Sequence, residues 1–273
     1  MRKSTALVSV ICVLVCFTGQ AAFGLQYFDS FVGYSVGSYP MGMATADFNG
    51  DGNPDLVTAN NAASSISVLL GDGDGTFATR VNYSTGASLN PYHVATGDLD
   101  GDGNVDIVSG GSMGFVVFYG AGDGTFDAGH LWYFGQQVLD IVMADFNNDT
   151  RLDIATSHAV RDSVGIHLNN NDSTYSTHMV AVGNGTVSLA AGYLDGDIYI
   201  DLLVGCSQGT VWNLQNDQAG SFIPTEVHIG LLNDPASVSI ADINGDNIGD
   251  FAVSHAVNDY LFTYLNNGDG TYS

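Results

Sequence analysis

A nine-residue segment rich in aspartate recurs five times along the chain, and its spacing constrains the fold more than any other feature. The copies begin at residues 47, 98, 145, 193 and 242, so neighbouring copies start 51, 47, 48 and 49 residues apart. A second marker, a turn such as Gly71–Thr76, follows about 24 residues after a copy begins. A regular period of about 49 residues predicts a repeat architecture, in which each repeat is one structural unit.

The runs between these markers predict short strands. Asp55–Ala59, Ile66–Leu70 and Phe115–Tyr119 are rich in β-branched and aromatic residues and are bounded by Gly, Asn or Asp. No amphipathic helix pattern follows residue 24. Each repeat has room for four short strands, which is the content of one propeller blade. The predicted fold is therefore all-β: a β-propeller of about five four-stranded blades over residues 25–273.

The two ends of the chain predict how such a ring would close. The last repeat stops at Thr271–Ser273, where its fourth strand should begin. Near the N-terminus, the segment Tyr27–Gly37 precedes the first loop, and its Tyr34–Gly37 resembles Tyr83–Gly86 in the outer strand of the first repeat. We expect the N-terminal strand to complete the last blade, which would leave no open sheet edge.

Residues 1–24 have the pattern of a secretory signal peptide. Arg2 and Lys3 form a basic start, Ala6–Phe17 is apolar apart from Ser9, and residues 22–24 form a cleavage site. The apolar stretch is shorter than the about 20 residues that a membrane helix needs. We expect a secreted protein, periplasmic if bacterial, with no membrane insertion after signal removal. Cys206 would then be the remaining cysteine, which excludes an internal disulfide.

The acidic composition narrows the choice of partners. The chain has 29 Asp and Glu against 5 Lys and Arg, with a formal net charge of −24. Such a charge excludes nucleic acid and anionic membrane surfaces as partners. Glu226 is the sole glutamate. The preference for Asp indicates tight loops that need a short carboxylate, rather than a generally acidic surface.

The nine-residue loops carry an all-oxygen donor set. Positions 1, 3, 5 and 9 are Asp or Asn in four copies, and position 7 can offer a backbone carbonyl. Hard oxygen ligands of this kind suit Ca²⁺. The alternative is that the loops are Asp-rich turns that bind no metal. The predicted ligands are Asp47, Asn49, Asp51, Asn53 and Asp55; Asp98, Asp100, Asp102, Asn104 and Asp106; Asp145, Asn147, Asp149, Arg151 and Asp153; and Asp242, Asn244, Asp246, Ile248 and Asp250.

The sixth position ranks the loops, because the backbone must turn sharply there. Glycine does so without steric cost, so loops 47–55 and 98–106 should bind best. Asn tolerates the left-handed region, which puts loop 242–250 next, whereas Thr150 predicts strain in loop 145–153. Loop 193–201 has lost its first ligand to Tyr193, and we expect weak or no binding by Asp195, Asp197 and Asp201. The prediction is three to five calcium ions per chain. The twelfth position of the four intact loops is never Glu, which disfavours an EF-hand.

The pattern Asp-Phe-Asn-Gly-Asp-Gly-x-x-Asp-Leu-Val resembles the FG-GAP/VCBS repeat family. That family includes the blades of integrin α-subunit propellers and many secreted lectin-like or enzyme-associated propellers. The resemblance implies that each loop joins the first two strands of a blade and binds calcium, through Asp47, Asn49, Asp51 and Asp55 in the first copy. Two features depart from the family: its rings usually have more than five blades, and the fourth copy lacks its first Asp. The first departure leaves open a truncated chain or a ring completed by a partner.

Two matching segments provide a candidate ligand surface. Ser157–Asp162 and Ser254–Asp259 are similar in sequence, and His158 and His255 occupy the same position in their repeats. One interpretation is a ligand-binding face; the other is that two duplicated repeats share a turn. The residues of the candidate face are His158, Arg161, Asp162, His255, Asn258 and Asp259.

These observations favour a non-catalytic binding or adhesion module in which calcium is mainly structural. The resemblance implies carbohydrate or extracellular protein as the ligand, since related propellers bind both. One alternative is a polysaccharide lyase or hydrolase built on a propeller, and another is a purely structural surface protein. Catalysis is disfavoured because most Asp residues belong to the loops, and a lyase needs a base and neutralising cations on one face.

Overall fold

The computed structural model describes residues 32–227, 235–255, 260–268 and 271–273, and Ser35–Ser273 forms one compact unit. Apart from the single 3₁₀ turn η1 (Asn61–Ala63), its regular elements are β-strands. Within the described ranges, no helix has the length and apolar character that crossing a membrane requires. The predicted signal peptide, residues 1–24, lies outside the described residues.

The strands form five antiparallel sheets, one for each sequence repeat. The first sheet holds β1 (Pro40–Ala46), β2 (Asp55–Asn60), β3 (Ser65–Leu69) and β4 (Val81–Ser84), and the second holds β5 (His93–Gly97), β6 (Asp106–Gly111), β7 (Gly114–Phe118) and β8 (His130–Tyr133). The third holds β9 (Ile141–Ala144), β10 (Asp153–His158), β11 (Ser163–Asn169) and β12 (Tyr175–Ala181). The fourth holds β13 (Thr186–Gly192), β14 (Asp201–Cys206), β15 (Thr210–Asn216) and β16 (Phe222–Val227), and the fifth holds β17 (Pro235–Ala241), β18 (Asp250–His255) and β19 (Tyr260–Tyr264).

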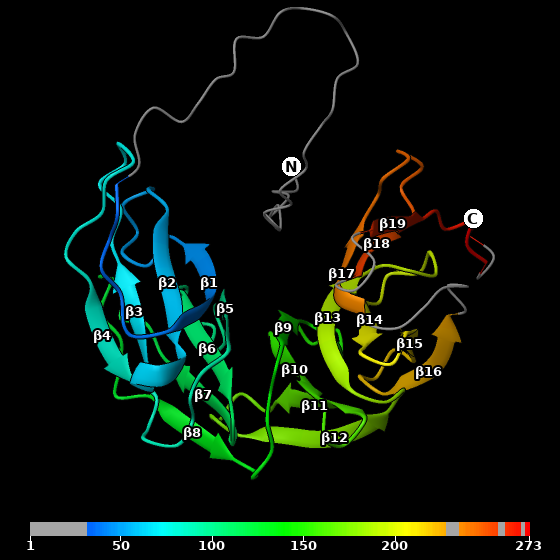
Figure 1. Cartoon of the computed structure of the whole chain (residues 1–273), viewed down its shortest axis with the longest axis horizontal. Coiled ribbons are helices and arrows are strands. Elements are labelled where there is room, and N and C mark those ends of the chain that lie inside the picture. Colours follow the sequence, from blue (N-terminus) through cyan, green and yellow to red (C-terminus); the bar gives the residue numbers. More distant parts are fainter. Residues whose placement is uncertain (1–31, 228–234, 256–259, 269–270) are drawn as a thin grey trace, which may run out of the picture. The chain divides into compact units, whose positions relative to one another are not determined.

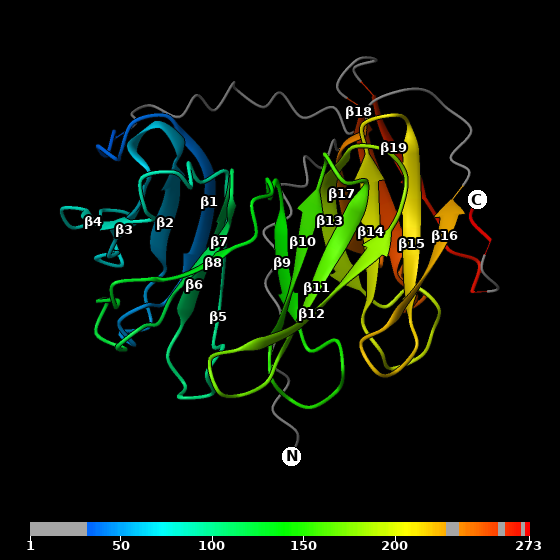
Figure 2. The ribbon, with the colours of Figure 1, turned by 90° about the horizontal axis from the view of Figure 1, so that it is seen from below.

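Consecutive sheets pack against one another through their first strands. β1 contacts β5, β5 contacts β9, β9 contacts β13 and β13 contacts β17, and these strands line the inner side of the arrangement in Figures 1 and 2. The core is divided accordingly into clusters between neighbouring sheets. Phe48 and Ile66 of the first repeat, for example, pack with Ile107 and Phe118 of the second. Because each sheet is covered by its neighbours, the central strands β2, β6, β10 and β14 are buried along most of their length.

This architecture confirms the predicted all-β, propeller-like fold, with four strands in each of the first four sheets. The fifth sheet has three strands among the described residues. The predicted closure by the N-terminal strand is not seen. Instead, Gly37 N donates to Ser67 Oγ at 3.2 Å and Arg80 Nη1 donates to Ser35 Oγ, so the segment just before β1 lies against the first sheet. Residues 27–31 of the predicted strand lie outside the described residues.

Candidate metal loops

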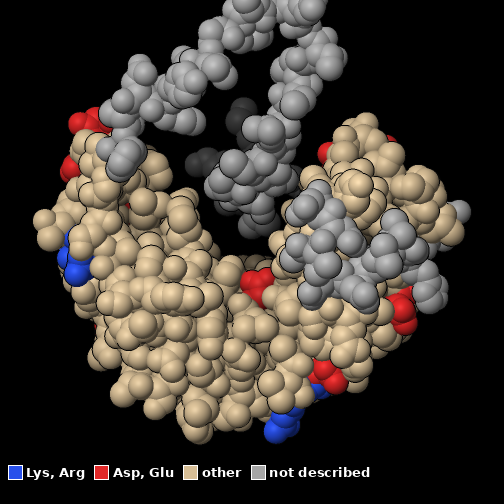
Figure 3. Space-filling view, in the orientation of Figure 1, with Lys and Arg blue, Asp and Glu red and all other residues tan. Residues whose placement is uncertain are grey.

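Each nine-residue loop connects the first and second strands of its sheet, as the family resemblance implied. The first loop leaves β1 at Asp47 and enters β2 at Asp55, and the other four loops lie in the same place. Few acidic side chains appear on the face in Figure 3, although the chain has 29 acids. The acidic side chains are therefore not spread evenly over the surface.

The aspartate at position 9 is a buried anchor in all five loops. Asp55 Oδ2 accepts a hydrogen bond from Phe48 N at 2.7 Å, and Asp55 Oδ1 accepts one from Gly71 N at 2.7 Å. One carboxylate thus joins the loop to the turn that follows the third strand. The same two bonds recur at Asp106, Asp153, Asp201 and Asp250. The sequence prediction treated the aspartate at position 9 only as a metal ligand. Because this aspartate is kept in the fourth loop, which has lost its first ligand, the sequence did contain a signal that it also anchors the loop.

Asparagines at the start of that turn connect neighbouring repeats, which the sequence reasoning missed. Asn169 Nδ2 donates to Leu99 O of the preceding repeat at 2.6 Å and to Leu152 O of its own repeat at 3.2 Å. Asn216 and Asn266 make the equivalent pairs of bonds. The backbones of three loops, 98–106, 145–153 and 193–201, are therefore each held by an asparagine of the repeat that follows.

Burial makes three of the position 9 carboxylates costly to ionise. It raises the pKa of Asp106, Asp153 and Asp201 to about 6, because burial outweighs the two backbone hydrogen bonds, and the loop carboxylates nearby add to the rise. A cation among these groups would favour their ionised form. The electrostatics of the loops thus fit a bound cation.

The aspartate at position 1 shapes the loop. Asp98 Oδ1 accepts from Gly101 N at 2.7 Å, and Asp98 Oδ2 accepts from Gly103 N at 3.0 Å. Both glycines have positive φ, +78° and +90°, which glycine adopts without steric cost. Asp47 and Asp242 bind the same two backbone positions in their loops, and Asp145 binds Asp149 N and Thr150 N.

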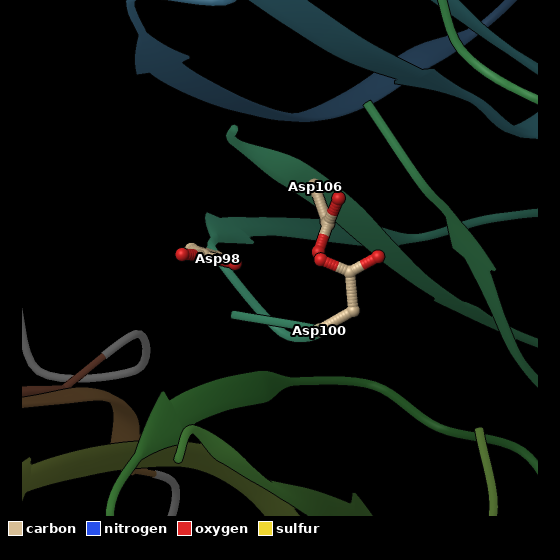
Figure 4. Close-up of side chains that lie close together, drawn as sticks. All are labelled: Asp98, Asp100 and Asp106. Atoms are coloured by element: carbon tan, nitrogen blue, oxygen red, sulfur yellow. The ribbon is translucent and has the colours of Figure 1, made fainter. Parts of the chain in front are cut away.

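Loop 98–106 brings its carboxylates close enough to share one ion. One oxygen each from Asp98, Asp100 and Asp106 lies within 4.8 Å of the others, and Figure 4 shows Asp100 and Asp106 pointing toward one another. Calcium–oxygen distances are about 2.3–2.6 Å, so two ligands of one ion lie at most about 5 Å apart. The all-oxygen donor set and its spacing therefore fit calcium. Burial, followed by the charges of Asp102 and Asp98, raises the pKa of Asp100 as well.

Loop 193–201 differs in the way that its sequence predicts. Tyr193 cannot accept the backbone hydrogen bonds of position 1, and Ile198 does not adopt the positive φ seen at position 6 elsewhere. Both side chains are exposed, at 52% and 72%. Among the described residues, Asp98, Asp100 and Asp106 are the one group of three acids gathered at ligand distance, so Asp195, Asp197 and Asp201 are not gathered in this way.

Loop 145–153 keeps all of its predicted ligands, but its backbone conformation and a neighbouring arginine are less favourable for binding an ion. Thr150 has a φ of +74°, which is strained for a β-branched residue. Arg151 Nη2 also donates to Asp149 Oδ2, which places a guanidinium against the carboxylate at position 5. Arg151 was predicted only to offer its backbone carbonyl. Its side chain would compete with a bound metal ion for Asp149.

The predicted ligand face is not assembled by its described residues. His158 and His255 do occupy equivalent positions, at the ends of β10 and β18, but their side chains are only 1% and 4% exposed. Their rings lie 5.4 Å from Phe134 and 5.2 Å from Phe262, respectively. Asp162 Oδ1 accepts from Gly185 N at 2.8 Å and so fixes a turn, and Arg161 lies in the same turn after β10. Asn258 and Asp259 lie outside the described residues.

The sequence matches the FG-GAP-like repeat family over residues 47–109, 98–156 and 194–253, which together make up more than half of the chain. The protein belongs to the FG-GAP-like repeat family, as its loop pattern predicted. A search of curated proteins gave no match.

Two solved structures are similar in fold. One comes from work on specific recognition of non-reducing terminal N-acetylglucosamine by an Agrocybe aegerita lectin; it is 22% identical, has a TM-score of 0.59, and aligns with 87% of this chain and 66% of its own. The other is BBS1N in complex with ARL6DN, 12% identical with a TM-score of 0.62, aligned over 88% of this chain and 69% of its own. This chain spans about two thirds of either structure. At these identities the similarity shows the fold alone.

Proposed function

We propose that this protein is a secreted binding module whose repeats are stabilised by calcium, with carbohydrate or extracellular protein as the ligand. The observation that carries the proposal is the shared backbone of loops 47–55, 98–106, 145–153 and 242–250. In each of these loops the first aspartate organises the turn and the ninth anchors it, and in loop 98–106 the carboxylate oxygens of positions 1, 3 and 9 lie within 4.8 Å of one another.

Calcium acts here as a structural ion. It supplies positive charge to carboxylates that otherwise repel one another, and by binding the folded state it adds to stability. The residues that hold it are positions 1, 3, 5 and 9 of the four loops, with the carbonyl at position 7. The chain itself contributes the anchoring bonds of Asp55, Asp106, Asp153 and Asp250, which tie each loop to the turn after the third strand.

The ligand class is supported by two observations of different kinds. The fold is shared with a lectin that recognises N-acetylglucosamine and with BBS1N, which was solved in a complex with another protein. The strongly negative charge excludes nucleic acid and anionic membranes. Secretion follows from the signal-peptide pattern of residues 1–24, after whose removal no membrane insertion is expected.

A glycan array and a panel of immobilised extracellular proteins, each probed with residues 25–273, test this proposal. We expect binding to a limited set of glycans or proteins in calcium, and loss of that binding in excess EGTA. No binding to either panel would contradict the binding role. Turnover of a polysaccharide under the same conditions would contradict the non-catalytic role.

A further inference from the structure

A pocket of about 230 Å³ lies between the second and third sheets. Its walls come from β7 and β8 on one side and from β10, β11 and β12 on the other, and no residue of the metal loops lines it. Phe115 and Trp132 stack at 5.5 Å on one wall, and Phe134 stacks on His167 at 5.8 Å on another. The pocket is thus bounded mainly by aromatic rings.

The third sheet has a small residue at a position where the other sheets carry a side chain. Gly165 lies opposite Thr156 in the pairing of β10 with β11. The equivalent residues of the other four sheets are Ser67, Val116, Trp212 and Phe262. A Cβ atom at Gly165 would lie 2.7–3.0 Å from Thr156 Oγ1, His158 Nε2 and His167 Nε2. The glycine therefore makes room for two imidazoles beside Thr156, where the first repeat has the smaller polar cluster of Asn60, Ser67 and Asn82.

The cluster around Thr156 is a chain of hydrogen bonds. Thr156 Oγ1 lies 2.8 Å from His158 Nε2 and 3.0 Å from His167 Nε2, and His167 Nδ1 lies 2.9 Å from Thr177 Oγ1. A threonine hydroxyl has one proton, so it donates to one imidazole and accepts from the other. At the position of His167 the other sheets have apolar or aromatic residues, namely Leu69, Phe118, Leu214 and Tyr264. Among the five described sheets, the third alone has an imidazole at this position.

Two buried polar atoms of residues that line the pocket are left without a partner. They are His158 Nδ1 and Gln136 Oε1. His158 is 1% exposed, and the backbone of Gln137 lies near it without forming a hydrogen bond of normal geometry. Buried polar groups are rarely left unpaired in folded proteins, because an unmade hydrogen bond is costly. A ligand in the pocket would supply the missing partners.

The pocket is built for an uncharged ligand. Burial lowers the pKa of His158 to about 4 and that of His167 to about 3, so both imidazoles are neutral at pH 7. No carboxylate, Lys or Arg is among the residues that line it. An ion transferred to such a site would lose its hydration without gaining a counter-charge.

The size and polarity of the pocket further restrict the class of ligand that it can bind. An apolar cavity of about 150 Å³ accommodates benzene, whereas pockets for drug-sized ligands start at about 300 Å³. A monosaccharide would bring several hydroxyls, each needing a partner, into a mostly aromatic site. We propose that this pocket binds an uncharged aromatic compound of one or two fused rings with one hydrogen-bond donor. Such binding goes beyond the proposed calcium and glycan functions and does not depend on them.

Calorimetric titration of indole into calcium-saturated residues 25–273 tests the proposal. Met179 is 43% exposed at the rim, so Met179→Trp should fill the pocket without disturbing the core. Met43→Trp makes the same exchange at an exposed position on β1 and serves as the control. We expect saturable 1:1 binding of indole, at least tenfold weaker in Met179→Trp and unchanged in Met43→Trp. No binding of indole up to its solubility limit, or equal binding by both variants, would overturn the proposal.

A second pair of titrations tests the hydrogen bond. Gln136→Leu removes the unpaired acceptor, and 1-methylindole lacks the N–H donor. Loss of one hydrogen bond should weaken indole binding by about threefold to tenfold, while leaving 1-methylindole binding unchanged by the substitution. Equal effects of Gln136→Leu on the two ligands would contradict the assigned donor. Matching unfolding temperatures would show that the variants are folded.

Discussion

Loops 98–106 and 193–201 occupy the same place in the second and fourth repeats. Three carboxylates of loop 98–106 lie within ligand distance of one another, whereas those of loop 193–201 do not. Both keep aspartate at positions 3, 5 and 9. The difference begins at position 1, where Asp98 accepts hydrogen bonds from Gly101 N and Gly103 N. Tyr193 offers no such acceptor, and Ile198 does not take the left-handed conformation that Gly103 has. The residues at positions 1 and 6 therefore distinguish the loop that gathers its carboxylates from the loop that does not.

The same comparison separates two roles of aspartate in the repeat. Asp106 and Asp201 make equivalent buried hydrogen bonds, at 2.8–2.9 Å, in the intact and in the degraded loop. The ninth position thus anchors the loop in both repeats, whereas the hydrogen bonds of the first position are present only in the intact loop. The fourth repeat keeps its sheet without an aspartate at position 1.

The largest expected effect follows from removal of the ninth aspartate. Asp201→Ala leaves the buried N–H groups of Leu194 and Asn216 without acceptors, which should lower the free energy of unfolding by about 2–5 kcal/mol. Because we expect loop 193–201 to hold no ion, the loss should be equal in calcium and in EGTA. Urea unfolding under both conditions measures it. A loss confined to calcium would show that loop 193–201 is a metal site after all.

Removal of the first aspartate should, by contrast, lower the stability of the protein mainly when calcium is present. Asp98→Ala should abolish one calcium site and, at calcium concentrations 100-fold above the dissociation constant, cost about 2.7 kcal/mol of stability. In EGTA the effect should be much smaller. Tyr193→Ala is the matched control in the fourth loop, and it should change neither the ion count nor the calcium-dependent stability. Calorimetry and thermal unfolding with each variant decide between these outcomes.

The pKa values of the two ninth aspartates should diverge when calcium is added. Without metal, both are about 6, above the about 3.9 of an unfolded chain. The folded protein then binds more protons between these values, so each group contributes stability at low pH that is lost as the pH rises through about 6. Calcium should lower the pKa of Asp106 and leave that of Asp201 in place. Carboxyl ¹³C titration by NMR would contradict the account if both shifted equally.

A metal site should be recoverable in the fourth loop. Tyr193→Asp together with Ile198→Gly restores the acceptor at position 1 and the turn at position 6. We expect the double variant to bind one more calcium ion than the unmodified protein. Each single variant serves as a control and should give a smaller gain. An unchanged ion count in the double variant would show that position 1 does not control the site.

The smallest expected effect concerns strain in loop 145–153. Thr150 has a φ of +74°, and Thr150→Gly should relieve about 1 kcal/mol of strain and tighten calcium binding at this loop. Gly52→Thr imposes the same side chain on loop 47–55 and should have the reverse effect. If neither variant differed from the unmodified protein in calcium affinity, the residue at the sixth position would not determine how tightly the loop binds calcium.

The sequence was sufficient to predict the repeat and the all-β sheets, because these depend on local residue types; the ranking of the loops by calcium binding stays a prediction. The divergence of the fourth loop, for example, follows from Tyr193 and Ile198 alone. Ring closure depends on contacts between distant parts of the chain, which local residue types do not specify; among the described residues, Ser35 and Gly37 form hydrogen bonds with Arg80 and Ser67 of the first repeat.

The burial of His158 and His255 also escaped the sequence analysis. A histidine at a strand end faces either the solvent or the neighbouring sheet, and the choice depends on packing between repeats. The asparagine bonds of Asn169, Asn216 and Asn266 between repeats depend on the same packing. Contacts of this long-range kind leave no local pattern in the chain.

The most direct test of the central claim is the number of calcium ions bound by residues 25–273, counted by calorimetry, with thermal unfolding in calcium and in excess EGTA. Loops 47–55, 98–106, 145–153 and 242–250 predict three or four ions and a large rise in unfolding temperature in calcium. No bound ion and no change in unfolding temperature would show that the aspartate loops are ordinary turns, and the account would fail.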